Sequence, residues 1–315
     1  MSKRQTLAII FFISCLTFFV WHKILNQTFF GEGYYYFDPK ITLGSHDNFA
    51  IIFFRFIVPL FQDNFRAYFL FQIGVMALLN VTLFYLVNYF TKSKFISLIS
   101  SILFLSSYLG LFEMFGTGNY QRFVQRVANL IPLLFSFVYF SKYLQSKKIK
   151  HYLISIFLFS LSVLMGHFST FLLPLFIIYP LIVSKSIKLS IPFVVINLLI
   201  ISRGSLFGEI QPAVPNHTWY LIRGPILQLA NLIIPPFITQ KIASLTNPYE
   251  NVLIAFILPV MILSLLAIKK IKADFPKLLP FYLLCLTMIP VLFLLNIVLG
   301  KVDPLFNIRG YNYYF

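Results

Sequence analysis

The sequence predicts an all-α polytopic membrane protein with about nine transmembrane helices and its N-terminus on the cytoplasmic side. Three observations predict this fold class. Hydrophobic residues make up 59% of the 315 residues and charged residues only 11%, whereas soluble domains carry roughly 25% charged residues. The apolar residues fall into runs of about the 20 residues that a spanning helix needs. Basic residues lie in the short polar stretches between these runs, as expected for loops at a membrane surface.

The first half of the chain contains four predicted spans. The first ends at Trp21-His22-Lys23 without a small-residue cleavage site, so we interpret it as a retained anchor rather than a signal peptide. The apolar stretch 49–61 contains Arg55 and Pro59, which favours a helix lying in the membrane interface of the first outer loop. The four spans cover about residues 6–25, 67–90, 95–115 and 127–144.

The apolar run 152–184 is too long for one span. As a single helix it would measure about 50 Å, against a hydrocarbon core of about 30 Å. It is broken by Gly166-His167-Phe168-Ser169-Thr170, so we predict a hairpin of two short spans that turns at His167. Three more spans are predicted at about residues 189–202, 251–268 and 278–299.

These elements form one predicted domain over residues 1–315. Its outer loops cover residues 26–66, 116–126 and 203–250, and the last is rich in proline. The sequence finishes at KVDPLFNIRGYNYYF, which looks like the start of a further span. We therefore expect the chain to be truncated after residue 315.

The predicted threading sorts the charges by side. It puts 14 of the 25 basic residues on the cytoplasmic side, 13 of them lysines, and leaves seven of the eight arginines outside. Of the nine acidic residues only Asp274 lies inside. This sorting satisfies the positive-inside rule and accounts for the net charge of +16 without a nucleic-acid partner.

The outer face therefore combines carboxylates with arginines. Residues 26–48 alone hold Glu32, Asp38 and Asp47, a third of all the acids. Arginine binds two phosphate oxygens at once through its planar guanidinium, so this face is expected to handle a phosphorylated lipid. The alternative is that these arginines only anchor the chain at the interface.

Three motifs carry a resemblance to a known superfamily. They are the acidic aromatic loop Gly31-Glu32-Gly33-Tyr34-Tyr35-Tyr36-Phe37-Asp38, the hairpin turn LMGHFSTFLLP, and the stretch Arg309-Gly310-Tyr311-Asn312-Tyr313-Tyr314. In this order the motifs resemble those of the GT-C integral membrane glycosyltransferases, among them protein mannosyltransferases and aminoarabinose transferases. The resemblance implies inverting transfer of a sugar from a polyprenyl-phosphate carrier to a glycan, lipid or protein acceptor at the outer face.

Such a reaction needs a carboxylate to deprotonate or orient the acceptor and positive charge to stabilise the leaving phosphate. We assign Glu32 as the first candidate base, Asp47 beside His46 as the second, and Asp38 before Pro39 as the third. Each of these acids has the alternative of being an ordinary solvated loop residue.

The candidate substrate-binding residues are basic. Arg122 and Arg126 lie four residues apart, on one face if helical, and are suited to clamp a phosphate or to bridge to Glu113. The remaining candidates are His167 at the hairpin tip, Arg309 from the resemblance, Arg203 in the long outer loop, and His46.

A cofactor is not assigned. His46, Asp47 and Glu32 are possible ligands of a divalent metal, but their spacing does not support a metal site. Cys15 and Cys285 fall inside apolar segments, which argues against a disulfide framework or a cysteine metal site.

The predicted location is the plasma or inner membrane, with the active site on the extracytoplasmic side. Two alternative functions remain open at this stage. A transporter or flippase for polyprenyl-linked glycans typically has internal repeats and charged sites near the midplane. An O-antigen-type polymerase uses a diphosphate-linked donor and would have its large outer loop at residues 203–250.

Overall fold

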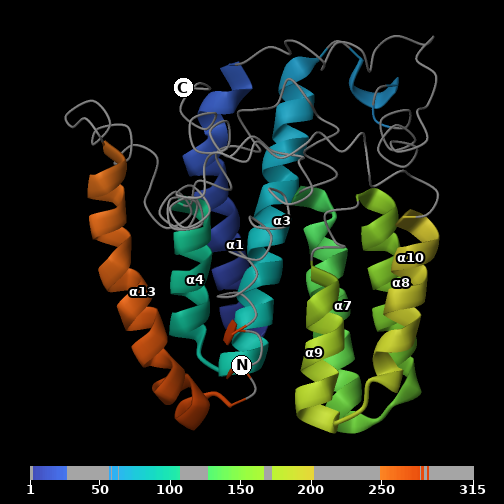
Figure 1. Ribbon diagram of the computed structural model, residues 1–315. Coiled ribbons are helices and arrows are strands. Elements are labelled where there is room, and N and C mark those ends of the chain that lie inside the picture. The colour runs from blue at the N-terminus through green and yellow to red at the C-terminus, as the bar shows by residue number, and fades with distance from the viewer. Residues whose placement is uncertain are drawn as a thin grey trace, which may run out of the picture. The chain divides into compact units, whose positions relative to one another are not determined.

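The structure is a computed structural model that describes residues 3–26, 57, 59–62, 64–106, 127–166, 172–201, 249–276, 278–279 and 282–283 (Figure 1). The chain divides into two compact units, and each is described by itself. Unit 1 comprises Met1–Leu105 with Phe112–Leu206, and unit 2 comprises Ser106–Leu111 with Phe207–Phe315. The elements described in both units are helices, which confirms the all-α prediction for these parts of the chain.

Most of the described helices belong to unit 1. Unit 2 contributes one long helix, α13 (Tyr249–Asp274), which carries Pro259 in its interior. The elements of unit 1 are α1 (Lys3–Trp21), η1 (His22–Asn26), α3 (Phe65–Thr91), α4 (Lys94–Ser106), α7 (Leu130–Ser146), α8 (Ile149–Met165), α9 (Leu173–Ser184), η5 (Lys188–Ser190) and α10 (Ile191–Ile201).

Helix α3 is the longest helix of unit 1, and local chemistry defines both of its ends. The Asn64 side chain accepts a hydrogen bond from the backbone N–H of Ala67 at 3.2 Å, which caps the first turn. At the other end Lys92 adopts a left-handed conformation, and its N–H donates to the Asn88 carbonyl. The 27 residues between these caps extend about 40 Å.

Three helices end in the same way, each on a lysine with positive φ. Lys92, Lys147 and Lys185 have φ angles of 57°, 54° and 53°, and each donates its backbone N–H to the carbonyl four residues earlier. Glycine usually occupies such a position because it has no Cβ to clash. Lysine instead brings a positive charge to the negative end of the helix dipole. These turns join α3 to α4, α7 to α8, and α9 to η5.

Each of these short connections reverses the direction of the chain (Figure 1). We call the end that carries Lys92, Lys147 and Lys185 the lysine end; it lies at the bottom of Figure 1. The N-terminus of α1 belongs to it too, since Lys94 donates to the side chain of Gln5 at 2.8 Å. The opposite end, which we call the loop end, contains Asn26, Phe65, Val127 and Ile201.

The core of unit 1 is built from aromatic rings. Phe137 and Phe140 of α7, Phe159 of α8, Phe176 of α9 and Phe193 of α10 are all almost completely buried. Their rings meet edge to face, tilted or stacked, with centroids 4.6 Å apart for Phe176 and Phe193 and 4.9 Å apart for Phe159 and Phe176. Such pairs add packing energy beyond that of apolar burial, so these four helices form one packed group.

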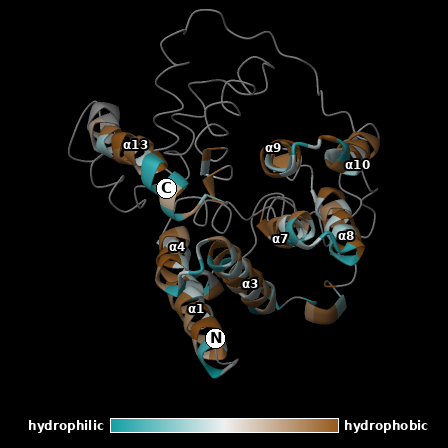
Figure 2. Ribbon diagram, turned by 90° about the horizontal axis from the view of Figure 1, so that it is seen from below, coloured by the Kyte–Doolittle hydropathy of each residue, from teal (hydrophilic) through white to brown (hydrophobic). Residues whose placement is uncertain are grey.

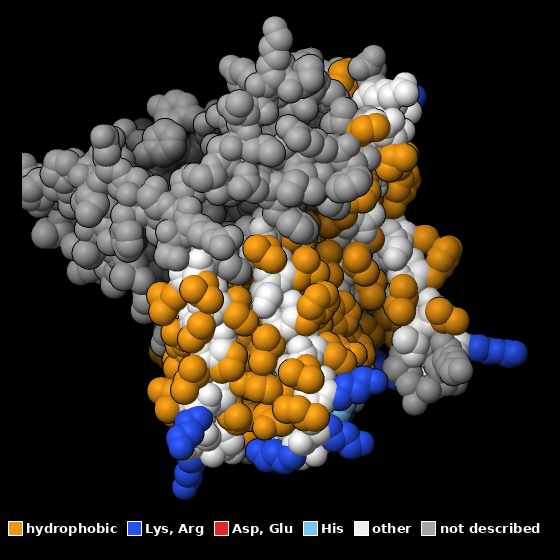
Figure 3. Space-filling view, turned by 90° about the vertical axis from the view of Figure 1, so that its right-hand side faces the viewer, with side chains coloured by type: hydrophobic (Ala, Val, Ile, Leu, Met, Phe, Trp, Pro, Cys, Tyr) orange, Lys and Arg blue, Asp and Glu red, His pale blue; other side chains and the backbone are white. Residues whose placement is uncertain are grey.

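The outside of unit 1 is also apolar. Phe11, Phe95 and Phe157 are exposed over 71%, 73% and 67% of their surface. Figure 3 shows hydrophobic side chains covering the helices on one face, with Lys and Arg gathered along the lower edge. Figure 2 shows the same from the lysine end: the helices are brown on most sides, and teal appears where they join.

Two of the described helices are long and apolar enough to cross a membrane, namely Arg4–Trp21 and Phe65–Thr91. The first lies near the N-terminus, and core helices and signal sequences can pass the same test. Four shorter apolar helices accompany them: Lys94–Leu105, Ile149–Met165, Leu173–Ser184 and Lys188–Leu199. These helices agree with a membrane-associated protein, and the count of nine spans stays a prediction.

The observed helices lie close to the positions predicted from the sequence. Predicted segment 67–90 corresponds to α3, 127–144 to α7 and 189–202 to η5 with α10. The run 152–184 consists of two helices, α8 and α9, which confirms that it does not form one long helix. Most of the interfacial helix 49–61 and of the span 278–299, and the outer loop 203–250 up to residue 248, lie outside the described residues.

Candidate functional site

None of the nine residues assigned to the site from the sequence falls in the described part of the chain. They are the candidate bases Glu32, Asp38 and Asp47 and the candidate binding residues His46, Arg122, Arg126, His167, Arg203 and Arg309. The residues that the structure does describe next to these nine positions show which helix ends lead to them.

Those adjoining residues gather at the loop end of unit 1. The acidic loop follows Asn26, which ends η1, and Arg126 directly precedes Val127. His167 directly follows Gly166, the cap of α8, and Arg203 comes two residues after Ile201, which ends α10. The described residues that adjoin four separate candidate segments therefore lie at the end opposite the lysines.

Asn129 joins two of these segments at a buried point. Its Nδ2 donates to the carbonyl of Gly166 at 3.3 Å, and its own carbonyl accepts from Ser162 Oγ at 2.8 Å. Both Asn129 and Ser162 are completely buried. This pair of bonds holds the residues next to Arg126 against the residue next to His167.

A second polar contact holds the same two helices together deeper in the unit. Ser136 Oγ donates to the Ser155 carbonyl at 2.7 Å, and Ser155 Oγ donates to the Ser136 carbonyl at 2.8 Å. Ser136 follows Asn129 by seven residues, and Ser162 follows Ser155 by seven, so each pair lies on one face of its helix. Small hydroxyl side chains allow the two helices to approach closely, which fixes the register of α7 against α8.

Gln72 of α3 is a polar group that no sequence argument singled out. Its side chain is completely buried, and neither its Nε2 nor its Oε1 has a hydrogen-bond partner among the described residues. It precedes Phe90 by five helical turns, so both lie on one side of α3, and Phe90 contacts Phe137 and Tyr179. Gln72 therefore faces the α7 side of α3, about 10 Å from the start of the helix at Phe65.

Among the residues that the structure describes, two further buried amide side chains have at least one atom without a hydrogen-bond partner. Within the described part of the chain the Oδ1 of Asn129 has no partner, and Asn80, in the middle of α3, is buried with neither side-chain atom bonded. A buried polar atom without a partner costs about 1–3 kcal/mol. The sequence signal for them is an amide inside an otherwise apolar run.

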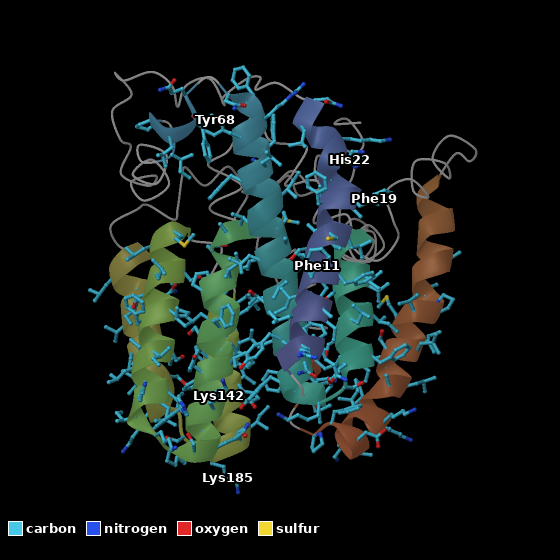
Figure 4. All side chains as sticks on the ribbon, turned by 180° about the vertical axis from the view of Figure 1, so that it is seen from behind. Phe11, Phe19, His22, Tyr68, Lys142 and Lys185 are labelled. Carbon is cyan, nitrogen blue, oxygen red and sulfur yellow. The ribbon has the colours of Figure 1, made fainter. Side chains whose placement is uncertain are left out.

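The first helix contributes exposed groups at the loop end. His22 Nδ1 lies 2.6 Å from the Phe19 carbonyl, so this nitrogen carries the proton and leaves Nε2 as the exposed ring nitrogen. Figure 4 shows His22 and Phe19 near the end of α1 and Tyr68 near the start of α3. His22 is four residues from Asn26, after which the acidic loop begins.

Among the described residues no group of three or more His, Cys, Asp or Glu side chains is arranged to hold a metal ion. The possible ligands Glu32, His46 and Asp47 lie outside those residues. Comparison of the chain with protein-family models, with curated proteins and with solved structures finds no match.

Proposed function

We propose that the protein is a multi-pass membrane glycosyltransferase that moves a sugar from a polyprenyl-phosphate donor to an acceptor at the extracytoplasmic face. In this proposal the loop end of unit 1 is the outer side and the lysine end is the cytoplasmic side. The observation that carries the proposal is this separation of the two ends along an apolar bundle. The GT-C-like order of the sequence motifs supplies the reaction type.

The apolar surface supports a membrane location. Large side chains such as Phe11 and Phe157 are exposed on the middle of α1 and α8, where contact with water would be unfavourable by about 25 cal/mol per Å² of apolar area. No Asp or Glu occurs among the described residues of unit 1. A lipid environment satisfies such a surface, and lysines at one end fit the positive-inside rule.

The short connections at one end of unit 1 and the long segments at the other support different roles for the two ends. Connections at the lysine end are only two or three residues long, as between Thr91 and Lys94. Residues 27–64, which carry Glu32, Asp38 and Asp47, connect Asn26 to Phe65, both at the loop end, and Arg122 and Arg126 come just before Val127 at the same end. In the proposed reaction Glu32, or else Asp47 or Asp38, takes the proton of the acceptor hydroxyl. Arg126 with Arg122 and Arg309 stabilises the phosphate that leaves.

The buried amides support a polar ligand inside this end of the bundle. Gln72 on α3 and Asn129 on α7 carry side-chain oxygen or nitrogen atoms that have no hydrogen-bond partner among the described residues, and Asn129 contacts Gly166, which adjoins His167. A sugar carries many hydroxyl groups, and each hydroxyl both donates and accepts. Sugar binding would give these amides the partners that they lack.

Membranes that contain the full-length chain test the proposal with a labelled polyprenyl-phosphate sugar and a mixed pool of acceptors. Glu32→Gln is expected to reduce transfer about 100-fold or more, since general-base catalysis contributes on that order. Asp274→Asn is the matched control, because Asp274 ends α13 beside Lys269, Lys270 and Lys272 on the predicted cytoplasmic side. The proposal is wrong if Glu32→Gln, Asp47→Asn and Asp38→Asn each leave transfer unchanged.

Asn80 favours a second candidate, a transporter or flippase for the same lipid-linked glycans. It is a buried, unpartnered amide in the middle of α3, and transporters bind their substrates near the membrane midplane. Asn80→Leu separates the candidates: it would abolish movement of a labelled lipid-linked glycan across proteoliposomes if the protein is a transporter, and it would leave sugar transfer intact if the protein is a transferase.

A further inference from the structure

The lysine end of unit 1 contains an organised cluster of positive charge and tyrosine rings between α3 and α7. Lys142 is half-buried, and its Nζ donates to the Tyr85 hydroxyl at 3.1 Å. The same ammonium lies 4.8 Å from the ring centroid of Tyr139, 5.5 Å from that of Tyr85 and 5.8 Å from that of Tyr89. Contacts of this length between an ammonium and an aromatic face are attractive, so the charge of Lys142 is held in one place.

A second lysine converges on the same ring from the other helix. Lys92, at the end of α3, has its Nζ 5.0 Å from the Tyr89 centroid. The Tyr89 hydroxyl also accepts a hydrogen bond from Gln145 Nε2 at 3.0 Å, which fixes the ring from the α7 side. The two ammonium groups thus lie 5.0 and 5.8 Å from the centroid of one tyrosine ring, and two positive charges placed around one ring together attract an anion.

The described residues of unit 1 provide no such anion, since none of them is Asp or Glu. The other basic side chains of this end, such as Lys150 and Lys185, are exposed and add to the positive field. Basic pockets between helices at the cytoplasmic surface are typical binding sites for the phosphate groups of anionic lipids. Tyrosine suits the same depth, because its ring is apolar and its hydroxyl is polar.

We propose that Lys92, Lys142, Tyr85 and Tyr89 form a binding site for the phosphate headgroup of an anionic phospholipid in the cytoplasmic leaflet. The site rests on the membrane placement proposed above but not on sugar transfer. The lipid phosphate neutralises Lys92 and Lys142, and the Tyr85 hydroxyl supplies a donor to a phosphate oxygen. The acyl chains lie along the exposed apolar side of α3, where Leu78 is 51% exposed.

Native mass spectrometry of the full-length chain in detergent tests the site by titration with phosphatidylglycerol and, separately, with phosphatidylcholine of the same acyl chains. We expect one phosphatidylglycerol to bind more tightly than the rest. Lys142→Gln and Lys92→Gln should each weaken that binding about fivefold, the usual contribution of one basic residue at an anionic membrane surface. Lys150→Gln and Lys185→Gln remove the same charge at the same end without a tyrosine contact, and they should change it less than twofold.

Further variants keep the test decisive if Lys142→Gln folds poorly. Lys142→Arg preserves the charge and should restore binding, whereas Tyr89→Leu should weaken it by removing the shared ring. Equal losses in all four lysine variants would overturn the proposal, because they would show only general charge attraction. Equal binding of phosphatidylcholine, or displacement of the lipid by inorganic phosphate, would overturn it as well. Unchanged sugar transfer in Lys142→Gln would leave the lipid site standing, so the two proposals fail independently.

Discussion

The Nδ2 atom of Asn129 donates a hydrogen bond to the carbonyl oxygen of Gly166 across 3.3 Å of buried space. This bond ties the residue where α7 begins to the residue where α8 has just ended. Arg126 and His167, two candidate binding residues far apart in sequence, adjoin the two ends of this tie. A basic site at this end of the bundle would therefore depend on a side chain that need not touch the substrate.

Removal of this tie is the first testable change. Asn129→Ala should lower the free energy of unfolding by about 1–3 kcal/mol, because the Gly166 carbonyl loses a buried donor. Under the proposed function it should also reduce sugar transfer. Thermal unfolding in detergent and the transfer assay measure the two effects. Ser160→Ala is the control, since Ser160 bonds only within its own helix, to the Ile156 carbonyl. A stability loss no larger than that of Ser160→Ala would contradict the role given to Asn129.

The reciprocal serine pair predicts a coupled effect. Ser136→Ala and Ser155→Ala should each destabilise the protein by about 0.5–1.5 kcal/mol. The double variant should cost less than the sum, because each single change already removes the direct contact between the two hydroxyl groups. Thermal unfolding of the four proteins gives the coupling energy between Ser136 and Ser155. Strict additivity would mean that the two hydroxyl groups act separately, despite their separation of 3.1 Å.

The lysines with positive φ predict that glycine is tolerated at these helix ends, although it destabilises the interior of a helix. Lys185→Gly should leave stability unchanged or raise it slightly, since φ of 53° suits glycine. Lys185→Val should lower stability by about 1–2 kcal/mol, because a β-branched side chain clashes in this conformation. Ser160→Gly provides the contrast, as Ser160 lies in the interior of α8, where glycine lowers stability. Thermal unfolding measures the stability of each variant. If Lys185→Gly is less stable than Lys185→Val, Lys185 does not have the left-handed conformation described above.

The membrane placement predicts which ends a water-soluble reagent reaches. In a chain with Cys15→Ala and Cys285→Ala, a cysteine at exposed Asn26 should react with a membrane-impermeant maleimide in intact cells. A cysteine at exposed Lys148 should react only after the cells are permeabilised, because it lies at the lysine end. Gel-shift labelling checks both positions. Labelling of both in intact cells would rule out the proposed orientation.

The sequence predicts the helices well because their signal is local. The length of an apolar run and a break such as Gly166-His167 both act over a few residues, and the structure has separate helices α8 and α9 on either side of that break. The pairing of Asn129 with Gly166 could not be predicted, since it joins residues 37 positions apart. Gln72 was missed for a related reason: an isolated amide in an apolar run becomes conspicuous only when its burial and its lack of a partner are known.

Gln72 yields the prediction that most directly separates stability from function. Gln72→Leu replaces a buried amide without hydrogen bonds by an apolar side chain of similar size. We expect the free energy of unfolding to rise by about 1–3 kcal/mol, the desolvation cost of such a group. If the amide binds the sugar donor, the same change should also reduce transfer, because leucine cannot form that hydrogen bond. Such a trade is common, since sites built for ligands are often less stable than an apolar alternative.

Gln145→Leu is the control, since Gln145 is exposed and bonded to Tyr89. It should neither stabilise the protein nor affect transfer. A stabilised Gln72→Leu variant with full transfer activity would show that Gln72 lies outside the site, and a destabilised variant would show that its amide already has a partner within the fold.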